Sequence, residues 1–135
     1  MAKPQRSNRL ADLGELQFQV LERLALIGEG TVYDLLDRFP PEERPRYTTV
    51  ATVLKALEGK RLATHRTRGR QYLFRPAVEL AEVKRGLVRD LLARVFRGSP
   101  RDLVATLFDA EAVTPEIAAE LRALLAQHAG GKRDA

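Results

Sequence analysis

Three threonines and a lysine lie on one face of a helix predicted between residues 47 and 60. Thr48 and Thr52 are four residues apart, Lys55 follows three residues later, and Thr49 adjoins them. Threonine offers a hydroxyl group and a methyl group, which suit hydrogen bonding to base acceptors and contact with thymine methyl groups, and its hydroxyl also binds phosphate. The pattern predicts a surface that contacts nucleic acid. The alternative is a solvated helix face that happens to carry threonine.

A second group of candidate residues is an arginine-rich loop. Residues 62–66 and 71–75 alternate as short strands do, and the loop of residues 67–70, Thr-Arg-Gly-Arg, joins them with a glycine available for positive φ. An arginine at such a tip can enter a minor groove or bind phosphate; the alternative is a strand edge protected by charge. Backbone amides at the start of the threonine-bearing helix also favour phosphate. The predicted DNA contacts are Arg46, Tyr47, Thr48, Thr49, Thr52, Lys55, Arg68 and Arg70.

Positive charge is concentrated in the middle of the chain. The 135 residues have a formal net charge of +5. Residues 38–75 carry ten Lys/Arg against three Asp/Glu, whereas residues 1–37 carry four against six and residues 76–135 carry nine against nine. A basic block of this size favours a polyanionic partner.

Apolar periodicity predicts the elements that carry these residues. A first helix begins after Asp12, which forms a capping-box pattern with Glu15, and ends at Gly28. A short second helix starts at Thr31, with Asp34 at its third position. The threonine-bearing helix and the hairpin follow. Three helices and then a hairpin is the order of a winged helix-turn-helix.

The second half of the chain is predicted to form three more helices, at about residues 77–96, 99–108 and 114–128. Two of them open on a serine or threonine followed by proline, a common helix start. So small a helical region buries its apolar stripes poorly by itself. We therefore predict pairing with a second copy, and packing against the first domain is the alternative. The residues predicted to build the dimer and its core are Leu80, Val83, Leu87, Leu91, Leu103, Leu107, Phe108, Ile117, Leu121 and Leu124.

Residue types that carry catalysis are sparse. The absence of cysteine excludes disulfides, thiolate metal sites and thiol catalysis. Ser99 is expected to cap a helix, and His65 and His128 lie far apart without metal-ligand spacing. The basic N-terminus is not followed by an apolar stretch, so no signal peptide is expected. We predict no enzyme activity, no cofactor and no metal, and a cytoplasmic location without membrane insertion.

Three segments together resemble a known family. Residues 47–62 (Tyr-Thr-Thr-Val-Ala-Thr-Val-Leu-Lys-Ala-Leu-Glu-Gly-Lys-Arg-Leu), 13–21 and 69–76 are similar to the BlaI/MecI/CopY family of penicillinase repressors, and the similarity runs from about residue 12 to 126. The resemblance implies an N-terminal winged helix and a C-terminal helical dimerisation region. It also implies a dimer that binds a palindromic operator and blocks transcription. The threonines would lie in the recognition helix of this fold, and Arg68 and Arg70 in its wing.

The resemblance also concerns how repression ends. Well-studied members are inactivated when a membrane sensor triggers cleavage between asparagine and phenylalanine in the dimerisation region. The corresponding pair in this chain is Leu107-Phe108, which lacks the asparagine. The copper-sensing branch uses a C-terminal cysteine cluster, which is missing here. A membrane sensor protease pathway stays an open alternative, and copper release by thiolates is excluded.

These observations predict a mainly α fold with a small β-hairpin wing. Residues 1–11 are expected to form a flexible N-terminal arm, 12–76 a winged helix DNA-binding domain, 77–128 a helical dimerisation domain and 129–135 a disordered tail. The predicted function is sequence-specific repression of transcription by a homodimer on a palindromic operator. The alternative is a winged helix adaptor that binds an acidic protein partner, or DNA non-specifically. An enzyme would need a site that the sequence does not contain.

Overall fold

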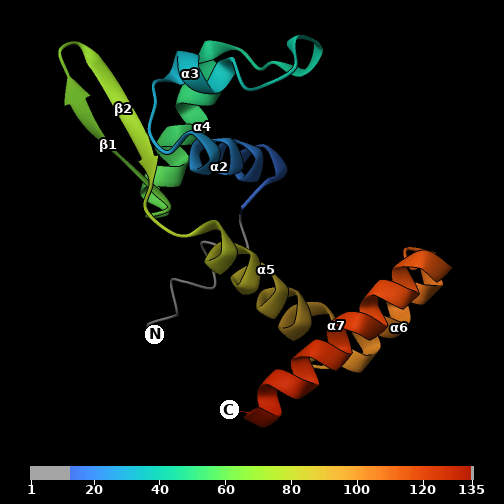
Figure 1. The fold of residues 1–135 in the computed structure, drawn as a ribbon. Coiled ribbons are helices and arrows are strands. Elements are labelled where there is room, and N and C mark those ends of the chain that lie inside the picture. Colours follow the sequence, from blue (N-terminus) through green and yellow to red (C-terminus); the bar gives the residue numbers. More distant parts are fainter. Residues whose placement is uncertain (1–12, 135) are drawn as a thin grey trace. The chain divides into compact units, whose positions relative to one another are not determined.

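A computed structural model describes residues 13–134, so the predicted arm at residues 1–11 and the predicted cap Asp12 lie outside the described residues. The described chain is mainly helical with one antiparallel hairpin (Figure 1), which confirms the predicted fold class. It divides into two compact units, Met1–Asp90 (unit 1) and Leu91–Ala135 (unit 2). The elements are α2 (Glu15–Ile27), α3 (Val32–Leu36), η1 (Pro41–Glu43), α4 (Tyr47–Gly59), β1 (Ala63–Arg68), β2 (Gln71–Pro76), α5 (Leu80–Val95), α6 (Pro100–Asp109) and α7 (Pro115–Asp134).

The first two described helices are fixed by local hydrogen bonds at their N-termini. Helix α2 begins at Glu15 and not directly after Asp12, and the side chain of Gln17 accepts the Gly14 N–H at 3.4 Å. In α3 the predicted start is confirmed: Thr31 Oγ1 accepts the Asp34 N–H at 3.1 Å, and Asp34 Oδ2 accepts the Thr31 N–H at 2.9 Å. This reciprocal cap satisfies two backbone donors that a helix end leaves without partners.

Loss of this cap is expected to destabilise unit 1. Thr31→Ala removes the acceptor of the Asp34 N–H and is expected to cost about 1 kcal/mol in the free energy of unfolding. Urea titration followed by circular dichroism measures it. Thr52→Ala is the matched control, because this exposed threonine lies inside α4, where alanine has the better helix propensity. Equal losses from both variants would show that the cap contributes nothing of its own.

The core of unit 1 lies between α2, α3, α4 and the hairpin. Helix α4 turns Val50, Leu54 and Leu57 inward at the predicted helical spacing, and all three are fully buried. The remaining members of this core cluster are Val20, Leu21, Leu24, Val32, Leu35, Leu36, Phe39, Leu62, Ala63, Phe74 and Val83. Because one side of α4 is committed to this core, its opposite side must face outward.

The residue that terminates α4 by adopting a left-handed backbone conformation is not a glycine. Gly59 is the last helical residue of α4, and Arg61, two residues later, takes the positive φ of 64°. The Leu62 N–H then donates to the Leu57 carbonyl at 2.9 Å, and the Leu62 side chain is fully buried. This is the Schellman arrangement of a helix C-terminus, with the hydrophobic residue after the left-handed position packed inward.

The hairpin is closed by a two-residue turn and anchored by a third segment. Arg68 pairs with Gln71, and Gly69 has a φ of 64°, as the first position of a type II′ turn requires. On the other edge of β2, Gly30 exchanges two backbone hydrogen bonds with Phe74, at 2.9 and 2.8 Å. A Cβ on Gly30 would lie 2.6 Å from Ile27 Cδ1 and 3.0 Å from Asp34 Cβ, so a larger residue here would require these side chains to shift.

Helix α5 begins later than predicted and is shared between the units. The Ala77 N–H donates to the Leu62 carbonyl at 2.9 Å, which holds residue 77 outside the helix, and α5 starts at Leu80. Val83 lies in the core of unit 1, and Leu80 and Leu87 pack against that core. The boundary between the compact units therefore falls at Asp90, whereas the predicted domains divide after residue 76. Val83 in particular, predicted to build the dimer, belongs to the core of the winged helix unit.

Unit 2 contains two helices whose starts are as predicted. Ser99 Oγ accepts the Asp102 N–H at 3.0 Å, and Thr114 Oγ1 accepts the Ile117 N–H at 3.2 Å. The predicted end of the last helix near residue 128, and the disordered tail at 129–135, differ from the structure, in which α7 continues to Asp134. The two glycines at 130 and 131 cost about 1 kcal/mol each relative to alanine in a helix interior, but they do not break the helix.

No side chain in residues 91–129 is buried. Large apolar side chains of this region are exposed instead, namely Leu91, Val95, Val104, Leu107, Phe108, Ile117, Leu124 and Leu125. Residues 91–129 of a single chain therefore form no fully buried hydrophobic core. None of the helices in residues 13–134 has the length and apolar character needed to cross a membrane.

Candidate nucleic-acid interface

The outer face of α4 carries the predicted base-reading residues. Thr48, Thr49, Thr52 and Lys55 are all exposed, on the side of the helix opposite its buried residues. The face thus combines short hydroxyl side chains with a single cation. Such a face fits a major groove, where short side chains let the helix backbone approach the base edges.

The N-terminus of α4 is open to an anion. Arg46 is the N-cap residue, but no side chain caps the helix, so the first backbone N–H groups have no side-chain acceptor. Arg46 itself is exposed next to them. Free amides, the positive end of the helix dipole and a guanidinium group together favour a phosphate.

Two exposed tyrosines lie at the junction of α3 and α4. Tyr47 begins α4 and is 45% exposed, and Tyr33 on α3 is 63% exposed, with ring centroids 5.0 Å apart. The sequence analysis identified Tyr47 and missed Tyr33. The signal available was a tyrosine at an outward position of the short α3 helix, between the buried Val32 and Leu35. The ring pair extends the candidate interface from α4 onto α3.

The wing presents its arginines unequally. Arg68 and Arg70 are exposed at and beside the turn of the hairpin, which projects from the helices of unit 1 in Figure 1. Arg66 is instead engaged by Glu29: its Nε and Nη2 donate to the two carboxylate oxygens at 2.8 and 3.0 Å. The arginine density of the sequence therefore does not form one uniform patch, because Arg66 is neutralised by a carboxylate from the loop between α2 and α3.

The charge balance around Glu29 reflects this pairing. The hydrogen bonds from Arg66 lower the pKa of the Glu29 carboxyl, partial burial opposes them, and the charges of Arg66, Arg75 and Arg68 lower it further. The hydrogen bonds to Glu29, and its negative charge, in turn raise the pKa of the Arg66 guanidinium. Glu29 is thus ionised at neutral pH inside a group of arginines.

A histidine of the hairpin contacts α4. The Nδ1–H of His65 on β1 donates to Oε2 of Glu58, in the last turn of α4. The imidazole is stacked on Tyr72, with centroids 4.2 Å apart and planes 21° apart. Glu58 was not among the predicted site residues, and for His65 the sequence analysis excluded only a metal-ligand spacing with His128. Nothing in the sequence pairs them, since their contact depends on how the hairpin returns to the helix.

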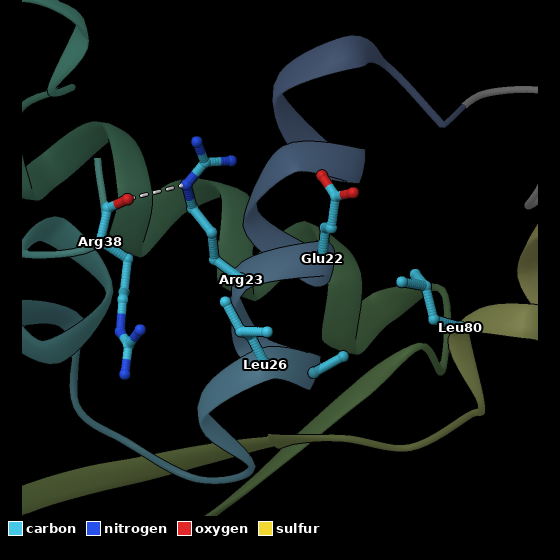
Figure 2. Close-up of a pocket in the computed structure, with 6 residues that line it drawn as sticks. Glu22, Arg23, Leu26, Arg38 and Leu80 are labelled. Carbon is cyan, nitrogen blue, oxygen red and sulfur yellow. Dashed lines mark hydrogen bonds between the residues drawn. The ribbon is translucent and has the colours of Figure 1, made fainter. Parts of the chain in front are cut away.

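A shallow depression lies on α2, away from these residues. Figure 2 shows its lining, with Leu26 and Leu80 beside charged side chains and the Arg23 Nε donating to the Arg38 carbonyl at 3.3 Å. The Arg23 guanidinium also lies 4.1 Å from the centroid of the Phe39 ring. No nucleophile and base meet here, so the depression offers no catalytic arrangement. Among the side chains that the structure describes, in residues 13–129, no three from His, Asp or Glu gather in a way that could hold a metal ion.

The fold and this surface define the protein as a winged helix DNA-binding regulator. Residues 13–127 match the profile of the family described as penicillinase repressor. The chain belongs to the penicillinase repressor family, and it is a DNA-binding transcriptional repressor and not an enzyme. The resemblance stated from the sequence is thereby confirmed over most of the chain.

Two other comparisons add less. Proteins with curated descriptions give no significant match. Among solved structures, an ArsR-like transcriptional regulator from Rhodococcus sp. RHA1 is similar, with 22% sequence identity and a TM-score of 0.46. The match covers 76% of this chain and 93% of that chain.

Proposed function

We propose that the protein acts in the cytoplasm as a homodimer that binds a palindromic operator with α4 in the major groove. The observation that carries the proposal is the two-sided character of α4. Its inner residues are fully buried, while every predicted contact on its outer face is exposed. A helix anchored by one side and polar on the other is the part of a helix-turn-helix that reads DNA.

The predicted contacts divide by chemistry into two groups. Thr48, Thr49 and Thr52 are short and uncharged, so in the proposal they contact base edges. The other residues carry a charge or a phenol and position the DNA backbone, and they are Arg46, Tyr47, Lys55, Arg68 and Arg70. Sequence preference is then assigned to the threonines, and salt dependence to the arginines and the lysine.

Unit 2 supports the homodimer. On α6 the exposed residues Val104, Leu107 and Phe108 share one face, and on α7 Ile117 and Leu124 do so with the half-buried Leu121. Water-exposed apolar stripes on helices without a core are best covered by the same stripes of a second copy. Leu91 and Leu103 belong to this proposed interface, whereas Leu80 and Leu87 already pack on unit 1.

Inactivation by proteolysis is not part of the proposal. The Leu107–Phe108 bond lies inside α6, so its backbone must open locally before a protease can cut it. Neither residue is the asparagine that precedes the cut in the well-studied members of the family. A membrane sensor pathway would need a recognition signal that this segment does not carry.

Selection of bound duplexes from a random DNA pool, at two salt concentrations, tests the proposal. A two-fold symmetric site, with half-sites about one helical turn apart, is the expected result. Recovery of no motif, with binding that vanishes as salt rises, would instead identify the basic face as a non-specific or protein-binding surface. The adaptor hypothesis would then replace the repressor on a palindromic operator.

Thr49→Ala is expected to weaken operator binding with little change in stability. A bidentate base contact is worth about 1–3 kcal/mol of discrimination, and the single hydroxyl of threonine is expected to contribute at the low end of that range. The side chain is exposed, so the fold loses no packing. Fluorescence anisotropy on the selected operator and on a scrambled duplex measures the ratio of the two affinities. Thr106→Ala, on the exposed surface of α6, is the control. A variant whose affinity ratio equals that of the wild type would remove Thr49 from base reading.

A further inference from the structure

Two neighbouring residues of β1 connect the wing to different parts of the helical body. His65 and Arg66 are adjacent on a strand, so their side chains point to opposite faces of the hairpin. His65 contacts Glu58 of α4, and Arg66 contacts Glu29 in the loop between α2 and α3. Contacts on both faces of the hairpin therefore fix it at the same position along β1.

The contact on the first face is both polar and aromatic. The His65 imidazole donates to Glu58, stacks on Tyr72 and lies 5.3 Å from Phe74, centroid to centroid. Phe74 is buried in the core. The ring thus joins the last turn of the recognition helix to both strands of the wing.

The contact on the second face is bidentate. Two parallel hydrogen bonds from one guanidinium to one carboxylate fix direction as well as distance. Glu29 is itself held in place, because the next residue, Gly30, pairs with Phe74 of β2 through its backbone. The Arg66 side chain is exposed and the Glu29 side chain is half-buried, and ion pairs in such contact with solvent add little to stability. The constraint that the pair places on the hairpin is geometric.

We propose that Glu58–His65 and Glu29–Arg66 are positioning pairs that set the angle of the wing relative to α4, so that Arg68 and Arg70 reach the DNA backbone. This inference rests on the proposed function. A two-stranded hairpin is marginal by itself, so its direction depends on the contacts at its base. The tip lies about 13 Å beyond His65 at the usual rise per residue. A tilt of about 15° then displaces the tip by about 3 Å, which breaks a hydrogen bond.

The test uses the double variant Glu29→Ala/Glu58→Ala. It removes two negative charges from the basic unit, so simple electrostatics predicts tighter DNA binding. The proposal predicts the opposite sign: about tenfold weaker binding to the selected operator, and a salt slope shallower by about one to two. Glu42→Ala/Glu43→Ala is the charge-matched control, since these two exposed carboxylates lie in η1, and it is expected to bind as well as the wild type or better.

Non-additivity separates positioning from a general loss of structure. In an Arg68→Ala/Arg70→Ala background the double variant is expected to cost nothing further, because the wing no longer makes the contacts that the two pairs position. Thermal melting checks that each variant is folded. Glu29→Gln/Glu58→Gln, which keeps side-chain oxygen acceptors, is expected to recover part of the affinity.

Three outcomes overturn the inference. They are tighter or unchanged binding by Glu29→Ala/Glu58→Ala, an equal loss in both backgrounds, and no recovery by the glutamine variant. If the wild type selects no operator, the proposed function fails together with the inference. If the wild type selects an operator and Arg68→Ala/Arg70→Ala weakens binding, while the glutamate variants do not, only the positioning inference fails.

Discussion

Leu54→Ala is expected to lower the free energy of unfolding by about 3 kcal/mol, within the usual range for a leucine deleted from a core. Leu54 is fully buried on the inner side of α4 and belongs to the core cluster of unit 1. The shortened side chain leaves a cavity between α4 and its neighbours. Urea denaturation monitored by circular dichroism measures the loss. Because the contact residues lie on the opposite side of α4, the folded fraction of the variant should keep its affinity for DNA.

Leu26→Ala provides the matched control for this experiment. Leu26 lies on α2 and is 72% exposed, so the same substitution removes almost no packing. A change within about 0.5 kcal/mol is expected. If the two leucine variants lost equal stability, the assignment of Leu54 to the core of unit 1 would be wrong.

Leu124→Glu is expected to convert the proposed dimer into monomers and to weaken operator binding by about 100-fold or more, because two linked half-site contacts become independent. Leu124 is half exposed on the apolar face of α7, where a charge would be buried without a partner in a dimer. Sedimentation velocity on the free protein and anisotropy on the operator measure the two effects. Unit 1, with its own core, should stay folded.

Ala123→Glu places the same charge one position earlier on α7. Ala123 is exposed and lies off the face shared by Ile117, Leu121 and Leu124. This variant should remain dimeric and bind the operator normally. A wild-type protein that sediments as a monomer, or a Leu124→Glu protein that sediments as a dimer, would contradict the proposed interface.

The helix starts that depend on nearby residues were predictable from the sequence. Thr31 with Asp34, Ser99 and Thr114 all cap helices as expected, because a cap and the N–H it accepts are only three residues apart. A contact with a residue farther along the chain shifted another boundary. Helix α5 begins late because Ala77 is hydrogen-bonded to Leu62, and that contact exists only after the hairpin has formed.

The candidate interface was predictable in part for a similar reason. Periodicity separates the inner from the outer side of α4, so the exposure of Thr48, Thr49 and Thr52 follows from spacing. Glu29 and Arg66 are 37 residues apart, and their pairing depends on the placement of Gly30 against β2. No local pattern contains that information. The apolar stripes of unit 2 were visible in the sequence, but Val83 was assigned to the wrong unit because periodicity gives a face without naming its partner.

The Schellman turn at Leu62 has a consequence for how chain length can vary among related repressors. The backbone N–H of Leu62 donates a hydrogen bond to the Leu57 carbonyl, and the Leu62 carbonyl accepts one from the Ala77 N–H. The Leu62 side chain is fully buried. An inserted residue here would shift the register of the whole wing. At the wing tip, Gly69 is exposed in open space, so only the positive φ of the turn constrains it. Insertions and deletions should therefore accumulate between β1 and β2, and the connection from α4 to β1 should keep a constant length.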